Sequence, residues 1–336
     1  MTAGWTAGRT RRLALAAALG VVGCGAPPVE SQPANPTPTS TIDVEALDRR
    51  LDALVTPGRG DGLALSVWVG GPTGEAWFAR DASTTRASAS AIKTAYLIEL
   101  FAAHADALDA PAPGADAIVH DDAHPAVAHF TADDRADIGA EIAGATIRRI
   151  GQMMIRGTGV SNAVYNAAAN VTTALLGGPE ALTGLIHDRA PAFGGLTVRR
   201  YMLAARDVTG DNEATAASLA AVLQRVAARD LPGLSRDTVT ALWEILRVPE
   251  DDGPLGLGTH YFKSGSLGSD PMIRIRSGFW DGPEGVIVYV VMAEQPTPGT
   301  RTRDAAAARL VEVSRAATDA VLAAARAARG DSLNRS

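Results

Sequence analysis

The alternation of apolar and polar residues predicts a helix, a strand hairpin and a second helix in the first part of the chain. Apolar residues recur at helical spacing over residues 44–55, and residues 63–69 alternate as in a strand. Residues 75–79 carry a second short strand pattern, and the GGPTG segment before them has the composition of a hairpin turn. A further helical pattern covers residues 91–104.

A helical block and a group of strands follow. Residues 137–246 are rich in alanine and carry few strand signals, which predicts helices. Three strands are then predicted over residues 259–263, 272–280 and 286–292. Residues 303–329 predict a long last helix that packs across the sheet. Strand segments therefore flank a helical block on both sides.

Composition excludes several classes of protein. The chain has 336 residues, 46% of them apolar and 20% charged, so it can bury a sizeable core as one large domain or two interlocked subdomains. The formal net charge of −6, without a basic patch, argues against a nucleic-acid partner. No run reaches 18 apolar residues, so no ordinary transmembrane helix is predicted.

Residues 1–23 have the pattern of a lipoprotein signal peptide. Arg9, Arg11 and Arg12 precede a short apolar stretch that ends at VVGC, and Cys24 is the only cysteine of the chain. The segment resembles a bacterial lipobox, so Cys24 is expected to carry the lipid that anchors the protein to the membrane of the cell envelope. A plain secretory signal or a free buried cysteine is the alternative.

Residues 24–41 predict a tether. Five prolines lie there among Ser, Thr, Gln and Asn, which leaves too few apolar side chains to form a core. The folded domain is expected over residues 42–330.

Only two of the 31 basic residues are lysines, and both lie in motifs that need one. Lys93 ends the SAIK segment, and Lys263 begins the KSG segment. An S-x-x-K match alone arises about once by chance in a chain of this length, so the pair carries the argument. Arginine would serve for charge alone, but only a desolvated lysine gives up its proton and acts as a base.

Ser90 is the candidate nucleophile of the SAIK segment. It precedes Lys93 by three residues on a predicted helix, so the amine can take the proton of the serine hydroxyl. Unpaired backbone N–H groups at the helix N-terminus favour the negative charge that develops on attack. A role for Ser90 as an N-cap is the other, compatible interpretation.

The two lysine segments resemble the first and third motifs of the serine β-lactamases and penicillin-binding proteins. The order of elements resembles the class A β-lactamase fold over residues 42–328. The resemblance implies an α/β (α+β), β-lactamase/transpeptidase-like fold, with a five-stranded antiparallel sheet flanked by helices and an all-helical subdomain at about residues 87–250. It also implies an acyl-enzyme formed on Ser90, with Lys93 as base.

The third motif is expected to bind substrate. By the resemblance, Lys263 and Ser264 contact a substrate carboxylate, and Gly265 keeps the strand edge bare so that substrate lies along it. The backbone N–H groups of Ser90 and Ser266 are expected to form the oxyanion hole.

Two segments are candidates for the middle motif, which is usually Ser-Asp-Asn in this superfamily. The VSN segment at 160–162 has the family's spacing to a later helix asparagine, here Asn166. The VYN segment at 164–166 fits an alignment on Asn170 and the following GGP instead. The first alignment is preferred.

In both alignments valine replaces the first serine, which in the family relays a proton to the leaving nitrogen. Ser161 is therefore expected to supply the hydroxyl, with Tyr165 as the alternative. Asn162 is expected to hold a substrate amide, and a plain turn role is the other interpretation.

The glutamate that activates the hydrolytic water in class A enzymes has no counterpart at the family's spacing. The corresponding stretch, residues 199–213, lacks the Glu-x-x-Leu-Asn pattern. Asp207 and Asp211 are its nearest acids. A protein that acylates without this base releases its acyl group slowly, as penicillin-binding proteins do.

No metal and no organic cofactor is expected, although His120, His124 and His129 near several aspartates leave a metal site as the alternative. The leading hypothesis is a monomeric, lipid-anchored serine hydrolase acting on a β-lactam, a cell-wall peptide or an ester. The alternatives are a penicillin-binding or peptidase-like protein that deacylates slowly, and a non-catalytic binding lipoprotein on the same fold.

Overall fold

The computed structural model describes residues 42–249, 257–299 and 301–333. The expected signal peptide, the tether and Cys24 lie outside these residues. Within the described part of the chain, no helix is both long enough and apolar enough to cross a membrane.

Five strands form one antiparallel sheet in the order β2-β1-β7-β6-β5, as the sequence predicts. The first hairpin joins β1 (Ala64–Gly70) to β2 (Ala76–Arg80). The later strands are β5 (Thr259–Leu267), β6 (Met272–Gly282) and β7 (Gly285–Gln295). Because β7 pairs with β1, the early hairpin and the late strands share one sheet, and β5 is left at its edge.

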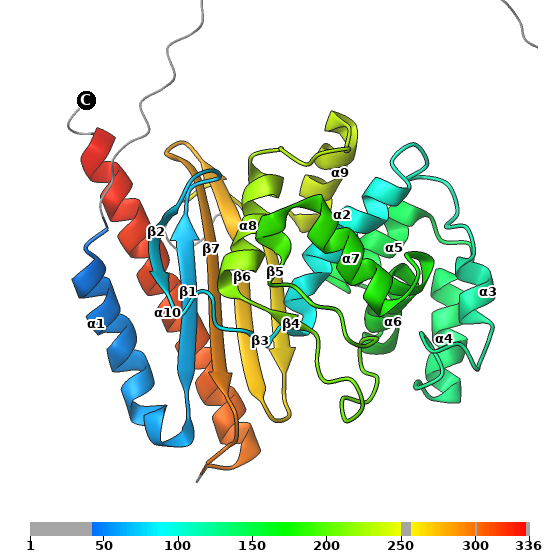
Figure 1. Ribbon diagram of the computed structural model, residues 1–336, viewed down its shortest axis with the longest axis horizontal. Helices are drawn as coiled ribbons and strands as arrows, with labels where there is room; N and C mark the ends of the chain where they lie inside the picture. The colour runs from blue at the N-terminus through cyan, green and yellow to red at the C-terminus, as the bar shows by residue number, and fades with distance from the viewer. Residues whose placement is uncertain (1–41, 250–256, 300, 334–336) are drawn as a thin grey trace, which may run out of the picture. The chain divides into compact units, whose positions relative to one another are not determined.

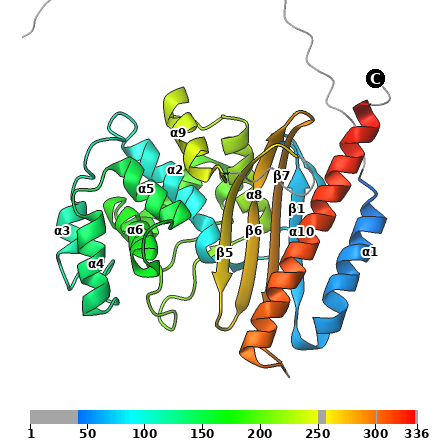
Figure 2. The same cartoon turned by 180° about the vertical axis from the view of Figure 1, so that it is seen from behind.

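Helices cover both faces of the sheet (Figures 1 and 2). On one face lie α1 (Val44–Val55) and α10 (Arg303–Leu333), and on the other lies α8 (Ala216–Ala227). Side chains of β7 alternate between the two cores, with Val290 in the core of α8 and Val291 in the core of α1 and α10. Successive residues of a strand point to opposite faces, so two buried faces require a continuous apolar run.

The helical part of the protein surrounds α2 (Lys93–Ala103), which is buried from Lys93 to Phe101. A short 3₁₀ turn, η2 (Ala89–Ile92), precedes α2, so the regular helix begins later than the sequence predicts. The other helices of this part are α3 (Ala115–Val119), α4 (Ala132–Ile142), α5 (Ile147–Arg156), α6 (Asn162–Leu175), α7 (Pro179–Arg189) and α9 (Arg236–Leu246).

Four smaller elements complete the described chain. Two-residue strands β3 (Arg86–Ala87) and β4 (Glu213–Ala214) pair with each other. This pairing and a hydrogen bond from Ser88 N–H to Asn212 O at 2.7 Å together place the segment after residue 200 next to η2. The 3₁₀ turns η1 (Thr56–Asp61) and η3 (Pro191–Phe193) follow α1 and α7.

Candidate active site

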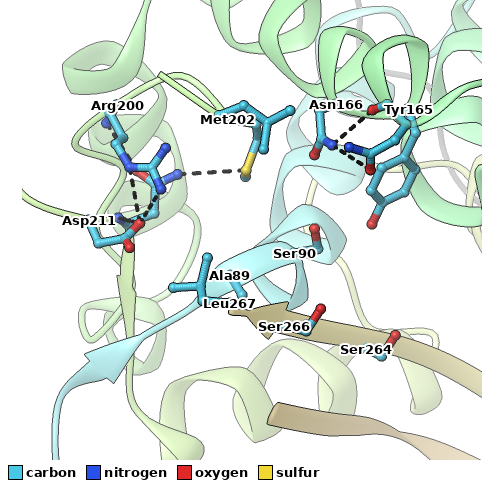
Figure 3. Close-up of a pocket in the computed structure, with 14 residues that line it drawn as sticks. Ala89, Ser90, Tyr165, Asn166, Arg200, Met202, Asp211, Ser264, Ser266 and Leu267 are labelled. Carbon is cyan, nitrogen blue, oxygen red and sulfur yellow. Dashed lines mark hydrogen bonds and ion pairs between the residues drawn. The ribbon is translucent and has the colours of Figure 1, made fainter. Parts of the chain in front are cut away.

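A pocket of about 290 Å³ opens at the edge of the sheet beside β5 (Figure 3). Its walls come from η2, the start of α6, residues 200–212 and the end of β5. Five predicted site residues line it, namely Ser90, Asn162, Ser264, Gly265 and Ser266. The structure therefore brings all three predicted motif regions to one place.

Ser90 lies half-buried in the η2 turn and lines the pocket. The residue before it, Ala89, has a φ of 45°, a left-handed conformation that is unfavourable for alanine. Such backbone strain often accompanies functional sites. The N-cap of the turn is Ser88, whose side chain makes no capping bond, so Ser90 is not the cap.

Lys93 follows Ser90 by three residues, at the start of α2, and is fully buried. Its Nζ donates to the backbone oxygen of Tyr165 at 3.2 Å and to Oδ1 of Asn166 at 3.0 Å. Burial, and secondly the nearby charge of Lys263, lower the pKa of Lys93 well below 10.5. A lowered pKa makes the neutral amine more abundant near neutral pH, which is what a base for a serine hydroxyl requires.

Lys263 is also buried, within β5, and does not line the pocket. Its Nζ donates to the backbone oxygen of Ile155 at 2.9 Å and to the hydroxyl of Tyr165 at 2.8 Å. Lys263 is therefore linked to the pocket through Tyr165, which lines it, and through the electric field of its positive charge. The exposed neighbours Ser264 and Ser266 line the pocket and offer their hydroxyl groups directly.

Gly265 has a structural role in addition to the one expected. A Cβ at this position would lie 2.9 Å from the backbone nitrogen of Ala91 and 3.0 Å from the backbone oxygen of Ser88. The missing side chain thus allows β5 to lie directly against the backbone of η2. It brings the third motif close to the nucleophile turn, in addition to bordering the pocket.

The VYN segment, not the VSN segment, contacts the lysines. Asn166 is buried and accepts a bond from Lys93, while its Nδ2 donates to both Asn162 O and Asn162 Oδ1, at 2.9 and 3.1 Å. Asn162 is exposed at the pocket mouth. The structure therefore favours the second alignment, in which Asn166 is the motif asparagine.

Ser161 is not brought into the site. It is the N-cap of α6, where its Oγ accepts from Val164 N at 3.3 Å and donates to Asp137 Oδ2 at 2.6 Å. It is absent from the pocket lining. This corrects the expectation for Ser161, because its hydroxyl is used to begin the helix, and the hydroxyl beside Lys263 is that of Tyr165.

Met202 occupies the pocket wall where a water-activating acid was sought. The buried Asn170 accepts from Met202 N at 2.5 Å and donates to Met202 O at 3.1 Å. This pair of bonds fixes the backbone of Met202 beside the pocket, and its thioether has no basic site. No sequence pattern distinguishes Met202 from its neighbours, and its place beside the pocket depends on the contact with Asn170, 32 residues away.

Among the described residues, Asp211 is the only carboxylate that lines the pocket. It pairs with Arg200 at 2.8 Å and with Arg206 at 3.1 Å, and it also accepts from the backbone N–H of Asn212 at 2.9 Å. The other candidate, Asp207, is exposed and not part of the lining. In the described part of the chain, no carboxylate of the lining is therefore left without a cationic partner to act as a base.

The three histidines considered for metal binding serve separate local contacts. His120 faces Asp116, His124 accepts from the backbone N–H of Ala126, and Nε2 of His129 contacts the oxygen of Met202. Over the described ranges, no group of three or more His, Cys, Asp or Glu side chains is arranged to hold a metal ion.

Solved structures have the same fold. A β-lactamase from Sphaerobacter thermophilus superposes with a TM-score of 0.57 at 19% identity, over 83% of this chain and 98% of that one. The β-lactamase from Streptomyces albus G matches with a TM-score of 0.55 at 18% identity, over 81% and 97%. A variant of PBP-A, in an acyl-enzyme complex with penicillin G, matches with a TM-score of 0.56 at 18% identity, over 82% and 96%.

No protein-family model matches the sequence, and no curated protein matches it either. The chain therefore has the fold of serine β-lactamases and penicillin-binding proteins, as the motif resemblance predicts. The low identities establish the fold alone.

Proposed function

We propose that this protein is a serine acyl-transfer enzyme that forms an ester between Ser90 Oγ and the carbonyl carbon of a β-lactam or a related amide or ester. The single observation that carries the proposal is a serine of η2 that lines the pocket, followed three residues later by the buried Lys93, whose pKa burial lowers. A structural lysine in a buried position would instead be expected to pair with a carboxylate. The hydrogen-bond acceptors of Lys93 are neutral oxygens.

Substrate recognition follows from the charge around the pocket. The negative charge of Asp211 is offset by its two arginine partners. With the charge of Lys263 beside Tyr165, the net charge around the pocket is therefore positive. Ser264 and Ser266 add hydroxyl donors at the exposed edge of β5. A small anionic substrate that carries a carboxylate near its reactive carbonyl suits this arrangement. The backbone N–H groups of Ser90 and Ser266 serve as the oxyanion hole in the proposal.

The acyl-enzyme is proposed to be long-lived. Hydrolysis of an ester on Ser90 needs a base to activate water, and the lining offers Met202 and an arginine-paired Asp211. The slowly deacylating, penicillin-binding type of protein therefore suits the site better than an efficient β-lactamase. No observation favours a non-catalytic binding role over these.

The test is the intact mass of the full-length protein over time, after mixing with benzylpenicillin and, separately, with a fluorophosphonate. We expect each reagent to add one adduct at Ser90, and we expect the penicilloyl adduct to persist for hours. Ser90→Ala is the control and should give no adduct. Absence of labelling by both reagents would rule out the acyl-enzyme, whereas loss of the penicilloyl mass within minutes would support an efficient hydrolase instead.

We further propose that the protein is exported and anchored by lipid on Cys24, which rests on the sequence pattern of residues 1–24. Expression with radiolabelled palmitate should label the wild type and leave Cys24→Ala unlabelled. Equal labelling of both proteins, or of neither, contradicts the anchor.

A further inference from the structure

Tyr165 lies between the two lysines of the protein. Its hydroxyl accepts a hydrogen bond from Lys263 Nζ at 2.8 Å, and the centroid of its ring is 3.4 Å from Lys93 Nζ. The ring centroid is 5.0 Å from Lys263 Nζ. One side chain thus presents its face to one lysine and its polar end to the other.

The position of the ring is fixed by close packing. Gly157, at the end of α5 with a φ of +62°, packs against it, and a Cβ on this glycine would be 2.8 Å from Tyr165 Cδ2. The side chain also lines the pocket that contains Ser90 (Figure 3). Tyr165 is therefore held in place and still accessible to a bound substrate.

The ring face suits the charge that Lys93 acquires during the reaction. Once Lys93 has taken the proton of Ser90 it is a buried ammonium, and its hydrogen-bond partners, Tyr165 O and Asn166 Oδ1, are uncharged. The charged group that acts on it from a neighbouring element is the cationic Lys263 on β5. The negative face of an aromatic ring attracts an ammonium at this distance, and the attraction strengthens when water is excluded.

The hydroxyl suits the other half of the reaction. Because Lys263 donates to the phenolic oxygen, the proton of the phenol remains free to be donated into the pocket. The lysine ammonium also stabilises the phenolate that is left when this proton is given up. The alternative hydroxyl, that of Ser161, is bound to Asp137 outside the pocket.

Given the proposed acyl-enzyme function, on which this inference rests, we infer that Tyr165 is a catalytic residue with two roles. Its ring face stabilises the ammonium form of Lys93 while Ser90 attacks, and its hydroxyl protonates the leaving nitrogen. One phenol would thereby replace the serine relay of the family and add a cation–π contact to the base.

Each proton that moves during acylation of Ser90 has a donor and an acceptor. Ser90 Oγ forms a bond to the carbonyl carbon and passes its proton to Lys93. The bond between that carbon and nitrogen breaks, and the nitrogen takes the phenolic proton of Tyr165. Lys263 re-protonates the phenolate, and the extra proton on Lys93 returns to Lys263 through the solvent of the pocket. The net change is an amide exchanged for a serine ester and an amine.

The test compares two leaving groups and two substitutions in the full-length protein. Benzylpenicillin needs a proton on its leaving nitrogen, whereas a fluorophosphonate loses fluoride without one. For Tyr165→Phe, which keeps the ring, we expect labelling by benzylpenicillin to slow about 10²-fold or more. Labelling by the fluorophosphonate should change by less than about 3-fold and keep the pH dependence of the wild type.

Tyr165→Leu removes the ring as well. Without the attraction of the ring, the ammonium form of Lys93 is less stable, so its pKa falls further. The acid limb of fluorophosphonate labelling should therefore move to lower pH than in Tyr165→Phe, and the plateau rate should fall because the base is weaker. Thermal unfolding of both variants checks that they are folded.

The outcomes separate this inference from the proposed function. Equal rates of penicillin labelling in wild type and Tyr165→Phe overturn the role of the hydroxyl. Identical pH profiles of fluorophosphonate labelling in Tyr165→Phe and Tyr165→Leu overturn the role of the ring. A wild-type protein that neither reagent labels overturns the acyl-enzyme proposal itself, and this inference with it.

Discussion

The side of the pocket made by η2 and β5 and the side made by α6 and residues 200–212 are held by different contacts. On the first side, backbone meets backbone, since Gly265 brings β5 against Ala91 and Ser88. On the second side, polar side chains hold the wall, through Asn170 on Met202 and Arg200 on Asp211.

The two sides also differ in chemistry. The first carries Ser90 and the buried Lys93 that the motif pattern requires. The second carries a tyrosine in place of a serine relay, and a methionine where a free acid would activate water. In the proposed function, formation and release of the acyl-enzyme depend on separate groups on the two sides, so one step can persist when the other is lost. A site built to acylate would therefore not by itself turn substrate over.

The largest effect is expected on the first side. Lys93→Met should slow labelling by benzylpenicillin by about 10²–10⁴-fold, because the base is removed. In the wild type, the labelling rate should rise with pH and level off below pH 10.5, since the pKa of Lys93 is lowered. A rate of labelling that is unchanged in the variant would exclude Lys93 as the base.

The same substitution should raise the thermal midpoint by several degrees. The folded pKa of Lys93 lies below the unfolded one, so the unfolded chain binds more protons between the two values. Stability of the wild type should therefore decline as pH falls through this window, and Lys93→Met should lack this contribution. Lys93→Arg, which keeps a charge there, is the matched control and should lower the midpoint.

On the second side, Met202→Glu should shorten the life of the penicilloyl adduct by about 10²-fold. The backbone of Met202 is fixed by Asn170, so a glutamate there would face the pocket and could activate water. Release is followed by the decay of the adduct mass. Met202→Gln has the same size without a basic group, and equally fast release from it would contradict general-base action.

Gly265→Ala tests the contact that joins β5 to the nucleophile turn. A methyl group 2.9 Å from Ala91 N must displace one of the two backbones. The rate of labelling by benzylpenicillin should therefore fall by about 10-fold, and the free energy of unfolding should fall by about 1–3 kcal/mol. Labelling quenched at successive times measures the rate, and denaturant unfolding measures the free energy. Gly268→Ala, where the added methyl meets nothing within 4 Å, should leave both unchanged.

The smallest effect on the chemistry is expected at Ser161. Ser161→Ala removes the N-cap of α6 and should cost about 0.5–2 kcal/mol of stability, with labelling rates within about 2-fold of wild type. Ser235→Ala, at the cap of α9, is the matched control for a capping serine. A loss of labelling in Ser161→Ala beyond that of the control would return Ser161 to the site.

Local patterns predicted most of the fold. The first helix was expected over residues 44–55 and is observed as Val44–Val55, because its apolar spacing and the Asp43 cap are both local features. The five strands appear where alternation predicted them, although β5, β6 and β7 run further than their patterns. Pairing with a neighbouring strand extends a strand through residues such as Ser264, Asp281 and Glu294 that have no apolar signal.

The middle motif could not be settled in the same way. Both candidate segments contain an asparagine and a hydroxyl-bearing residue, and they lie four positions apart where α6 begins. Only contacts from other elements distinguish them, since Ser161 is drawn to Asp137 of α4 and Tyr165 to Lys263 of β5.

The sequence by itself determined the order of elements and the Ser90–Lys93 pair, because each depends on residues within one or two turns of the chain. The tertiary structure decided which asparagine meets Lys93, which hydroxyl meets Lys263 and which side chain stands beside the pocket. These contacts join residues 73, 98 and 32 positions apart. Partners so distant are chosen by how helices pack on the sheet and on one another, which no local spacing encodes.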